Sequence, residues 1–117
     1  MEEDFLREAQ SEYGSFVRID EEGSRLRIEA TSGKSWTTER SQLELKVGDG
    51  ITGRVAKTGE TYCSNDVSSD PNYICVLSEV SSELAIPVKV AGEVWGIIDL
   101  DSDKRAHYGA SCILRMA

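Results

Sequence analysis

The stretch SELAIPVKVAGEVWGIIDLDS, residues 82–102, constrains the fold more than any other part of the chain. Two apolar runs rich in Val, Ile and Leu flank the dipeptide Ala91-Gly92, which is a credible two-residue turn. This arrangement predicts a β-hairpin. The hairpin begins with an acidic residue, Glu83, and ends with two more, Asp99 and Asp101. These carboxylates either solubilise the strand ends or line a site.

The register of this hairpin decides whether the three carboxylates meet. Side chains alternate between the two faces of a strand, so a strict two-residue turn places Glu83 on the opposite face from Asp99 and Asp101. The three converge only if a β-bulge intervenes. The strict register assigns one shared face to Val90, Val88, Ile86, Leu84, Trp95, Ile97 and Asp99. Both faces are largely apolar, which indicates a sheet that is covered on both sides.

The other predicted elements make this an α+β domain with an antiparallel sheet. They are, in order, an amphipathic helix over 4–13, a hairpin over 14–31, a brief strand before a glycine turn at 48–50, a helix over 51–57 that stops at Gly59, a strand over 61–64 and a last helix over 106–117. Helices are expected to cover one face of the sheet, and the irregular segment 64–81 to roof the other. A sheet face roofed by loops is a natural place for a small-molecule cavity.

Composition and charge narrow the class of protein. A chain of 117 residues is sized for one domain. Its net charge of −8 disfavours nucleic acid and acidic membranes as partners, because neither can gain from counterion release. No apolar run approaches the length of a membrane span, and the acidic N-terminus does not resemble a signal peptide, so the sequence predicts a cytoplasmic protein.

The cysteine pattern argues against a cross-linked or metal-bound scaffold. The three cysteines are an odd number and form no C-x-x-C pair. We therefore expect reduced thiols, no bound metal and no cofactor. Cys63 is expected to pack inward from its strand, and Cys75 is either a buried small hydrophobe or a reactive thiol.

Three motifs together resemble those of a GAF domain, the small-molecule sensing module of bacterial sensor kinases, cyclic-nucleotide phosphodiesterases and transcription activators. They are GDGITGRVAKTGE at 48–60, NDVSSDP at 65–71, and SELAIPV with GEVWGIIDLDS at 82–102. The resemblance implies a central antiparallel sheet of about six strands, with terminal helices on one face and loops or short helices over a pocket on the other. It also implies one domain over 1–117, which stands alone or is a fragment of a longer signalling protein.

The function implied by this resemblance is sensory or regulatory. The domain would bind an unidentified small molecule and signal through a homodimer, formed by its terminal helices, or through an attached output domain, as in two-component or transcription regulation. The residues expected to bind the ligand are Tyr73, Cys75, Val76, Leu77, Glu83, Trp95, Ile97 and Asp99. The acidic rim favours a ligand with a cationic group, such as an amino acid or an amine. Asp99 and Asp101 have an alternative role in local hydrogen bonds to the backbone.

Two other branches of the family remain as alternatives. In a GAF-type free methionine-(R)-sulfoxide reductase, Cys75 would be catalytic, and Glu83, Asp99 and Asp101 would be the matching acidic residues. The positions of the other two cysteines of that branch hold Thr52 and Gln42, so Cys63 or an external thiol would have to resolve the sulfenic acid, and we do not expect an enzyme. The second alternative is a degenerate domain that serves dimerisation only. The signatures for cyclic nucleotide, bilin and haem are not present.

Overall fold

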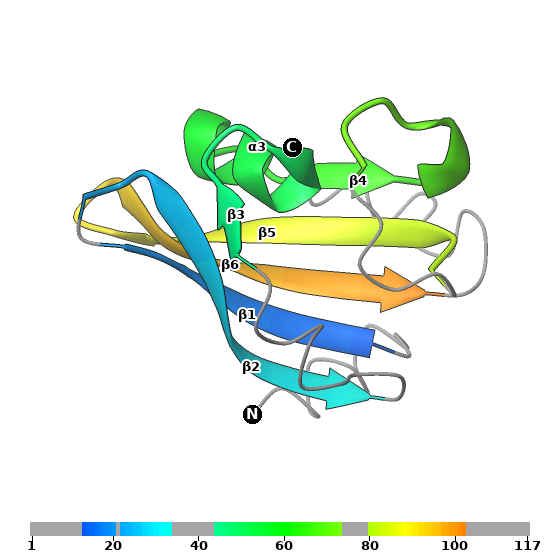
Figure 1. The fold of residues 1–117 in the computed structure, drawn as a ribbon, viewed down its shortest axis with the longest axis horizontal. Coiled ribbons are helices and arrows are strands. Elements are labelled where there is room, and N and C mark those ends of the chain that lie inside the picture. Colours follow the sequence, from blue (N-terminus) through cyan, green and yellow to red (C-terminus); the bar gives the residue numbers. More distant parts are fainter. Residues whose placement is uncertain (1–12, 21, 34–43, 74–79, 103–117) are drawn as a thin grey trace.

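The computed structural model describes residues 13–20, 22–33, 44–73 and 80–102. Its elements are the strands β1 (Tyr13–Ile19), β2 (Arg25–Gly33), β3 (Glu44–Lys46), β4 (Tyr62–Ser64), β5 (Ser82–Val90) and β6 (Glu93–Ser102), the helix α3 (Gly50–Thr58) and the 3-10 turn η1 (Val67–Ser69). The strands form one antiparallel sheet in the order β3-β2-β1-β6-β5-β4 (Figure 1). This confirms the predicted α+β class and the sheet of about six strands. The predicted terminal helices, over 4–13 and 106–117, lie outside the described residues except for Tyr13.

The β5–β6 hairpin closes at the predicted dipeptide. Ala91 and Gly92 both have positive φ, at 53° and 83°. Two positive φ angles in a two-residue loop match the twist of the flanking strands, which is why such turns close hairpins so often. The turn therefore forms as predicted, with Ala91 in a conformation that L-residues rarely adopt.

Helix α3 begins and ends where glycines permit it. The chain leaves β3 through a tight turn in which the Gly48 N–H donates to the carbonyl oxygen of Gly53, 2.8 Å away. A Cβ on Gly53 would lie 2.7 Å from the carbonyl oxygen of Lys46, so only glycine allows the helix to approach β3 this closely. At the other end Gly59 adopts φ 72° and its N–H donates to the carbonyl of Val55. The predicted strand-turn-helix unit is confirmed.

The two faces of the sheet carry separate apolar clusters. On the first face, which we call the α3 face, Ile51 and Val55 of the helix pack with Val17 and Ile97 of the sheet. Val67 and Val80, which lie within the segment 64–81 predicted to roof one face, belong to the same cluster. Figure 1 shows α3 beside β5. The opposite face carries a smaller cluster built on Leu84 and Leu100 of β5 and β6. Among the described residues, the structure holds no helix that is both long and apolar enough to cross a membrane.

The start of the chain's first strand departs from the prediction. Tyr13 was placed at the end of an amphipathic helix, whereas it is the first residue of β1 and is buried. It pairs with Gly33 of β2 on one side and with Asp101 of β6 on the other. These two ladders outweigh the helical spacing of apolar residues, since tertiary pairing routinely overrides a local pattern.

The strict register predicted for the β5–β6 hairpin is wrong beyond its first pairs. Lys89 lies opposite Val94, but Val88 lies opposite Gly96, so Trp95 is an extra residue and forms a β-bulge. From there on every β6 residue faces the other way relative to β5. Leu84, Ile86 and Val88 consequently share a face with Ile98 and Leu100, and not with Ile97 and Asp99 as predicted.

Candidate functional site

The bulge brings the three carboxylates to one face of the sheet. Glu83 lies directly opposite Asp101. Asp99 lies two residues before Asp101 in β6, so its side chain points to the same face. The sequence left this convergence dependent on a bulge, and the bulge is present. The shared face is the α3 face. Ala85 lies two residues after Glu83 and Ile97 two residues before Asp99, so both point to the same side as the carboxylates, and both belong to the core cluster of the α3 face.

Strand pairing extends the carboxylates into two polar rows across β1, β6, β5 and β4. The first row is Tyr13, Asp101, Glu83 and Ser64, and the second is Ser15, Asp99, Ala85 and Tyr62. We call these eight residues the polar floor. Every member except Ala85 carries a side-chain oxygen, and every member except Tyr62 is buried. Buried side-chain oxygen atoms at the centre of a sheet are unusual, and they make the polar floor our candidate site.

The carboxylates at the middle of the floor lie close together and away from water. Glu83 and Asp101 are 5% exposed and Asp99 is 8% exposed. One oxygen from each lies within 4.8 Å of the others. Within the described ranges, the one ion pair joins Arg18 to Glu29, so none of the three carboxylates is neutralised by a described Lys or Arg.

Burial raises the pKa of all three groups, and repulsion adds to the rise for Glu83 and Asp101. Burial, followed by the charge of Asp99, raises the pKa of Glu83 and of Asp101 well above the usual range. Burial also raises the pKa of Asp99, while hydrogen bonds from Glu83 and Asp101 oppose that rise. The pKa of all three carboxyl groups is thus raised, and the rise is larger for Glu83 and Asp101 than for Asp99. The Oδ1 atom of Asp99 is buried and has no hydrogen-bond partner in the described part of the chain.

One edge of the floor is held by a hydrogen-bonded network. The Tyr62 hydroxyl donates to Oδ2 of Asp70 over 2.8 Å and accepts from Nδ2 of Asn72 over 3.1 Å. The Asn72 N–H donates to Oδ1 of Asp70 over 2.8 Å. Sequence reasoning did not single out Tyr62 or Asp70. The contact of Asp70 with β4 depends on the fold, so no local pattern in the sequence indicated it.

The predicted ligand residues fall into three groups. Glu83 and Asp99 lie in the polar floor, and Ile97 adjoins it as a fully buried core residue. Tyr73 is half-buried and packs against the same cluster. Cys75, Val76 and Leu77 lie outside the described residues.

Trp95 lies apart from the other predicted ligand residues. It is 41% exposed, its ring centroid is 5.4 Å from that of Phe16, and the Arg18 guanidinium carbon lies 3.8 Å from its centroid. Phe16 and Arg18 pair with Ile98 and Gly96, on the face opposite the carboxylates. The bulge that gathers the carboxylates thus separates Trp95 from them.

The expectation of reduced cysteines is wrong for Cys63. This residue is disulfide-bonded, and it packs beside Leu84 and Leu100. Cys63 is the one cysteine among the described residues, because Cys75 and Cys112 lie outside them.

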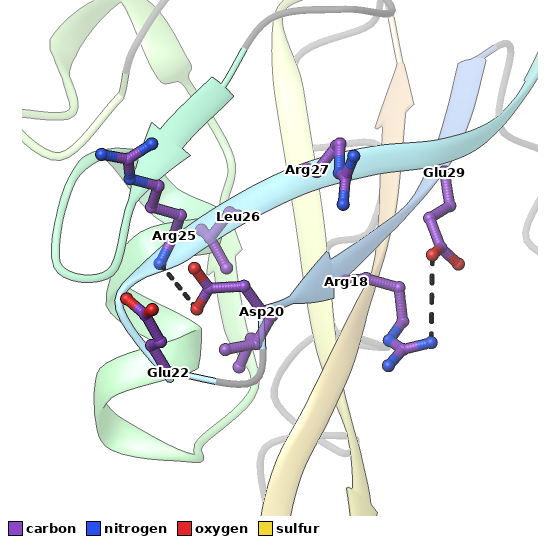
Figure 2. A pocket seen from close by; sticks show the side chains of 8 residues that line it. Arg18, Asp20, Glu22, Arg25, Leu26, Arg27 and Glu29 are labelled. Atoms are coloured by element: carbon purple, nitrogen blue, oxygen red, sulfur yellow. Dashed lines mark hydrogen bonds and ion pairs between the residues drawn. The ribbon is translucent and has the colours of Figure 1, made fainter.

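A hollow of about 700 Å³ lies elsewhere, along the β1–β2 hairpin (Figure 2). It is lined by Arg18, Ile19, Asp20, Glu22, Arg25, Leu26, Arg27 and Glu29. The Asp20 carboxylate accepts hydrogen bonds from the backbone N–H groups of Ser24 and Arg25, and these bonds lower its pKa. Arg18 is engaged with Glu29 over 3.9 Å. Because charges of both signs alternate around it and the polar floor takes no part, this hollow is a surface groove and not our candidate site.

Comparison with known proteins identifies the family. Residues 3–111 match the GAF domain family, so the chain belongs to it. The Nif-specific regulatory protein of Azospirillum lipoferum is 31% identical over 100 residues, which span 76% of this chain and 16% of that protein. The chain therefore covers about one sixth of the length of this relative.

Two similar solved structures are enzymes. The type II free methionine-R-sulfoxide reductase from Thermoplasma acidophilum matches with a TM-score of 0.79 and 26% identity, over 97% of this chain and 77% of that one. The free methionine-R-sulfoxide reductase from Neisseria meningitidis, solved in complex with its substrate, matches with a TM-score of 0.80 and 25% identity, over 96% and 65%. The fold is thus that of GAF domains with both regulatory and catalytic members.

Proposed function

We propose that this domain is a regulatory module that binds a small molecule bearing a positive charge above the polar floor. The observation that carries the proposal is the Trp95 bulge, which gathers Glu83, Asp99 and Asp101 into one buried cluster with no described basic partner. Buried charge is costly unless it is paired. A cation on the ligand would supply the missing pair.

The ligand's positive charge would contact Asp99, and the carboxyl groups of Glu83 and Asp101 would orient that carboxylate. Ile97 would extend the floor on its apolar side. Tyr73, Cys75, Val76 and Leu77 are the candidates for the roof. The floor joins four strands, whereas the roof belongs to the irregular segment 64–81, so the ligand would lie between a rigid base and a loop.

Occupancy would be passed on as a population shift. A ligand that prefers one arrangement of the 64–81 roof biases whatever packs against that roof. Terminal helices that pair two copies, or that lead to an output domain, would respond to the bias. The resemblance to a Nif-specific regulatory protein supports this role, and a cytoplasmic homodimer is the form we propose.

The test is thermal unfolding of the full chain with amino acids and amines, including free methionine-(R)-sulfoxide. A ligand at 100 times its dissociation constant should add about 2.7 kcal/mol to the free energy of unfolding. Asp99→Asn should abolish the shift, whereas Glu93→Gln, which removes an exposed carboxylate near the hairpin turn, should preserve it. If no compound shifts the midpoint, the proposal fails and a dimerisation-only domain becomes the better account.

The second candidate is a free methionine-(R)-sulfoxide reductase. It is favoured by the two similar reductase structures and by the disulfide at Cys63. The Cys75 thiolate would attack the sulfoxide sulfur, releasing methionine and leaving a sulfenic acid. Cys63 would then displace water to form a disulfide, which an external dithiol reduces. Methionine produced from the sulfoxide and dithiothreitol by the natural chain, but not by Cys75→Ser, would support this candidate over the regulatory one.

A further inference from the structure

We infer that the positive charge taken up by Glu83, Asp99 and Asp101 is a hard divalent metal ion, held by one oxygen of each carboxylate. The inference rests on the proposed function for its site, but it assigns the positive charge there to a metal ion and not to a cationic group of the ligand. The sequence predicted no metal because that prediction rested on the cysteine pattern, and the strict hairpin register placed Glu83 on the opposite face from Asp99 and Asp101.

The geometry of the cluster suits a single ion. Magnesium, manganese and calcium bind carboxylate oxygens at about 2.0–2.6 Å, so two ligands of one ion lie at most about 5 Å apart. The three carboxylates offer one oxygen each within 4.8 Å of one another. Two adjacent strands hold them, with Glu83 and Asp101 directly paired and Asp99 one step along. The backbone therefore sets their spacing before any ion arrives.

A second observation points to a missing ligand. Oδ1 of Asp99 is fully buried, has no hydrogen-bond partner among the described residues, and belongs to a side chain that is only 8% exposed. An unpaired buried acceptor loses its hydration without compensation. A metal ion between the carboxylates would satisfy this oxygen.

The surroundings of the cluster supply no competing cation in the described part of the chain. The titratable groups that face it are Tyr13 from β1, Tyr62 from β4 and Asp70 from the segment after η1. None of them is basic. Arg54 of α3 lies over the Tyr62 ring, 5.8 Å from its centroid. Within the described part of the chain, only protonation of the carboxyl groups themselves would neutralise the cluster, so its charge is otherwise left to a metal ion or to a cationic group of a ligand.

Metal and protons should compete for these oxygens. Burial favours the protonated forms of Glu83 and Asp101 when the site is empty, and a metal ion requires the deprotonated forms. Affinity for the ion should therefore rise with pH, and binding should release protons to the buffer.

The experiment is a titration of the full chain with Mn²⁺, followed by the loss of the free-ion electron paramagnetic resonance signal. One Mn²⁺ per chain should bind, more tightly at about pH 8 than at about pH 5. Asp99→Asn should weaken binding, because it removes one of the three negative charges that hold the ion. Glu83→Gln serves as the second ligand variant, and Glu93→Gln is the matched control that removes an exposed carboxylate. Far-ultraviolet circular dichroism confirms that each variant is folded.

The outcomes separate this inference from the proposed function. Binding that survives both Asp99→Asn and Glu83→Gln would show an adventitious surface ion and overturn the inference. If the natural chain binds no Mn²⁺ but an ammonium compound shifts its unfolding in an Asp99-dependent way, the metal inference fails and the proposed function stands. If neither Mn²⁺ nor any ammonium compound binds, both fail.

Discussion

The two ends of the β5–β6 hairpin invert the usual distribution of polarity. At the turn end, Val90 is 57% exposed and Trp95 is 41% exposed, whereas at the other end Glu83 and Asp101 are each 5% exposed. The carboxylate end is flanked by β1 and β4 (Figure 1). Strand β4 pairs with β5 only over Glu83–Ala85, so it does not reach the turn end. Burial here follows position in the sheet and not hydrophobicity. Packing alone would favour apolar residues in the better-buried half of a hairpin, so acidic residues there indicate a role other than packing.

The largest expected effect compares two truncations on the same strand. Leu84→Ala, at the carboxylate end, should lower the free energy of unfolding by about 2–5 kcal/mol, because its fully buried side chain would leave a cavity. Val90→Ala, at the turn end, should change it by less than about 0.5 kcal/mol. Urea unfolding measures both. Similar losses for the two variants would show that the ends do not differ in burial as described.

The junction between the two ends should also resist change. A Cβ on Gly96, the residue after the bulge, would lie 2.7 Å from Cζ of Phe16 and 2.9 Å from the carbonyl oxygen of Val17. Gly96→Ala should therefore cost about 1–3 kcal/mol of stability. Adding Phe16→Ala to Gly96→Ala removes the contact with the ring but leaves the contact with the Val17 carbonyl oxygen. The second substitution should therefore not restore the part of the stability that is lost to the backbone contact. A fully stable Gly96→Ala chain would contradict the close approach of β1 and β6.

The carboxylate end should show a pH dependence that the turn end lacks. Burial raises the pKa of Glu83 well above its usual range. Folding thus favours the protonated form, so stability is complete below the usual glutamate pKa of about 4.3 and is lost as pH rises through the folded-state value.

Glu83→Gln does not titrate and should be more stable than the natural chain by about 0.5–2 kcal/mol at about pH 8 in the presence of a chelator. The difference should shrink toward about pH 4. Thermal unfolding across this range is the measurement, with Glu93→Gln as the control. A difference that stays constant with pH would argue against a raised Glu83 pKa.

The smallest expected effect concerns the aromatic contact at the bulge. Trp95→Ala removes the stacking of Arg18 on the indole ring, which should cost about 0.5–1 kcal/mol. A double-mutant cycle with Arg18→Ala isolates that term. Binding of Mn²⁺ or of an ammonium ligand should be unchanged, since Trp95 lies on the other face. If binding is lost, Trp95 takes part in the site, as the sequence alone suggested.

Local sequence signals predicted the regular elements well. The helix predicted over 51–57 is observed as Gly50–Thr58, and its stop at Gly59 has the expected left-handed conformation. The turn at Ala91-Gly92 and the hairpin between β1 and β2 also form as predicted. Asp66 accepts a hydrogen bond from the Ser68 N–H, as an Asx-type turn requires. These features depend on residues within a few positions of one another, which is why a sequence can predict them.

Sequence alone determined the α+β class, the family and the residue types available for a site, because alternation, turn residues and motifs are local properties. The tertiary structure alone decided which of these residues meet. One extra residue at Trp95 turned Asp99 and Asp101 toward Glu83, and pairing with β1 and β4 added Tyr13 and Ser64 to the same row. A bulge is set by the balance of packing on both faces of a sheet, so no window of sequence contains it.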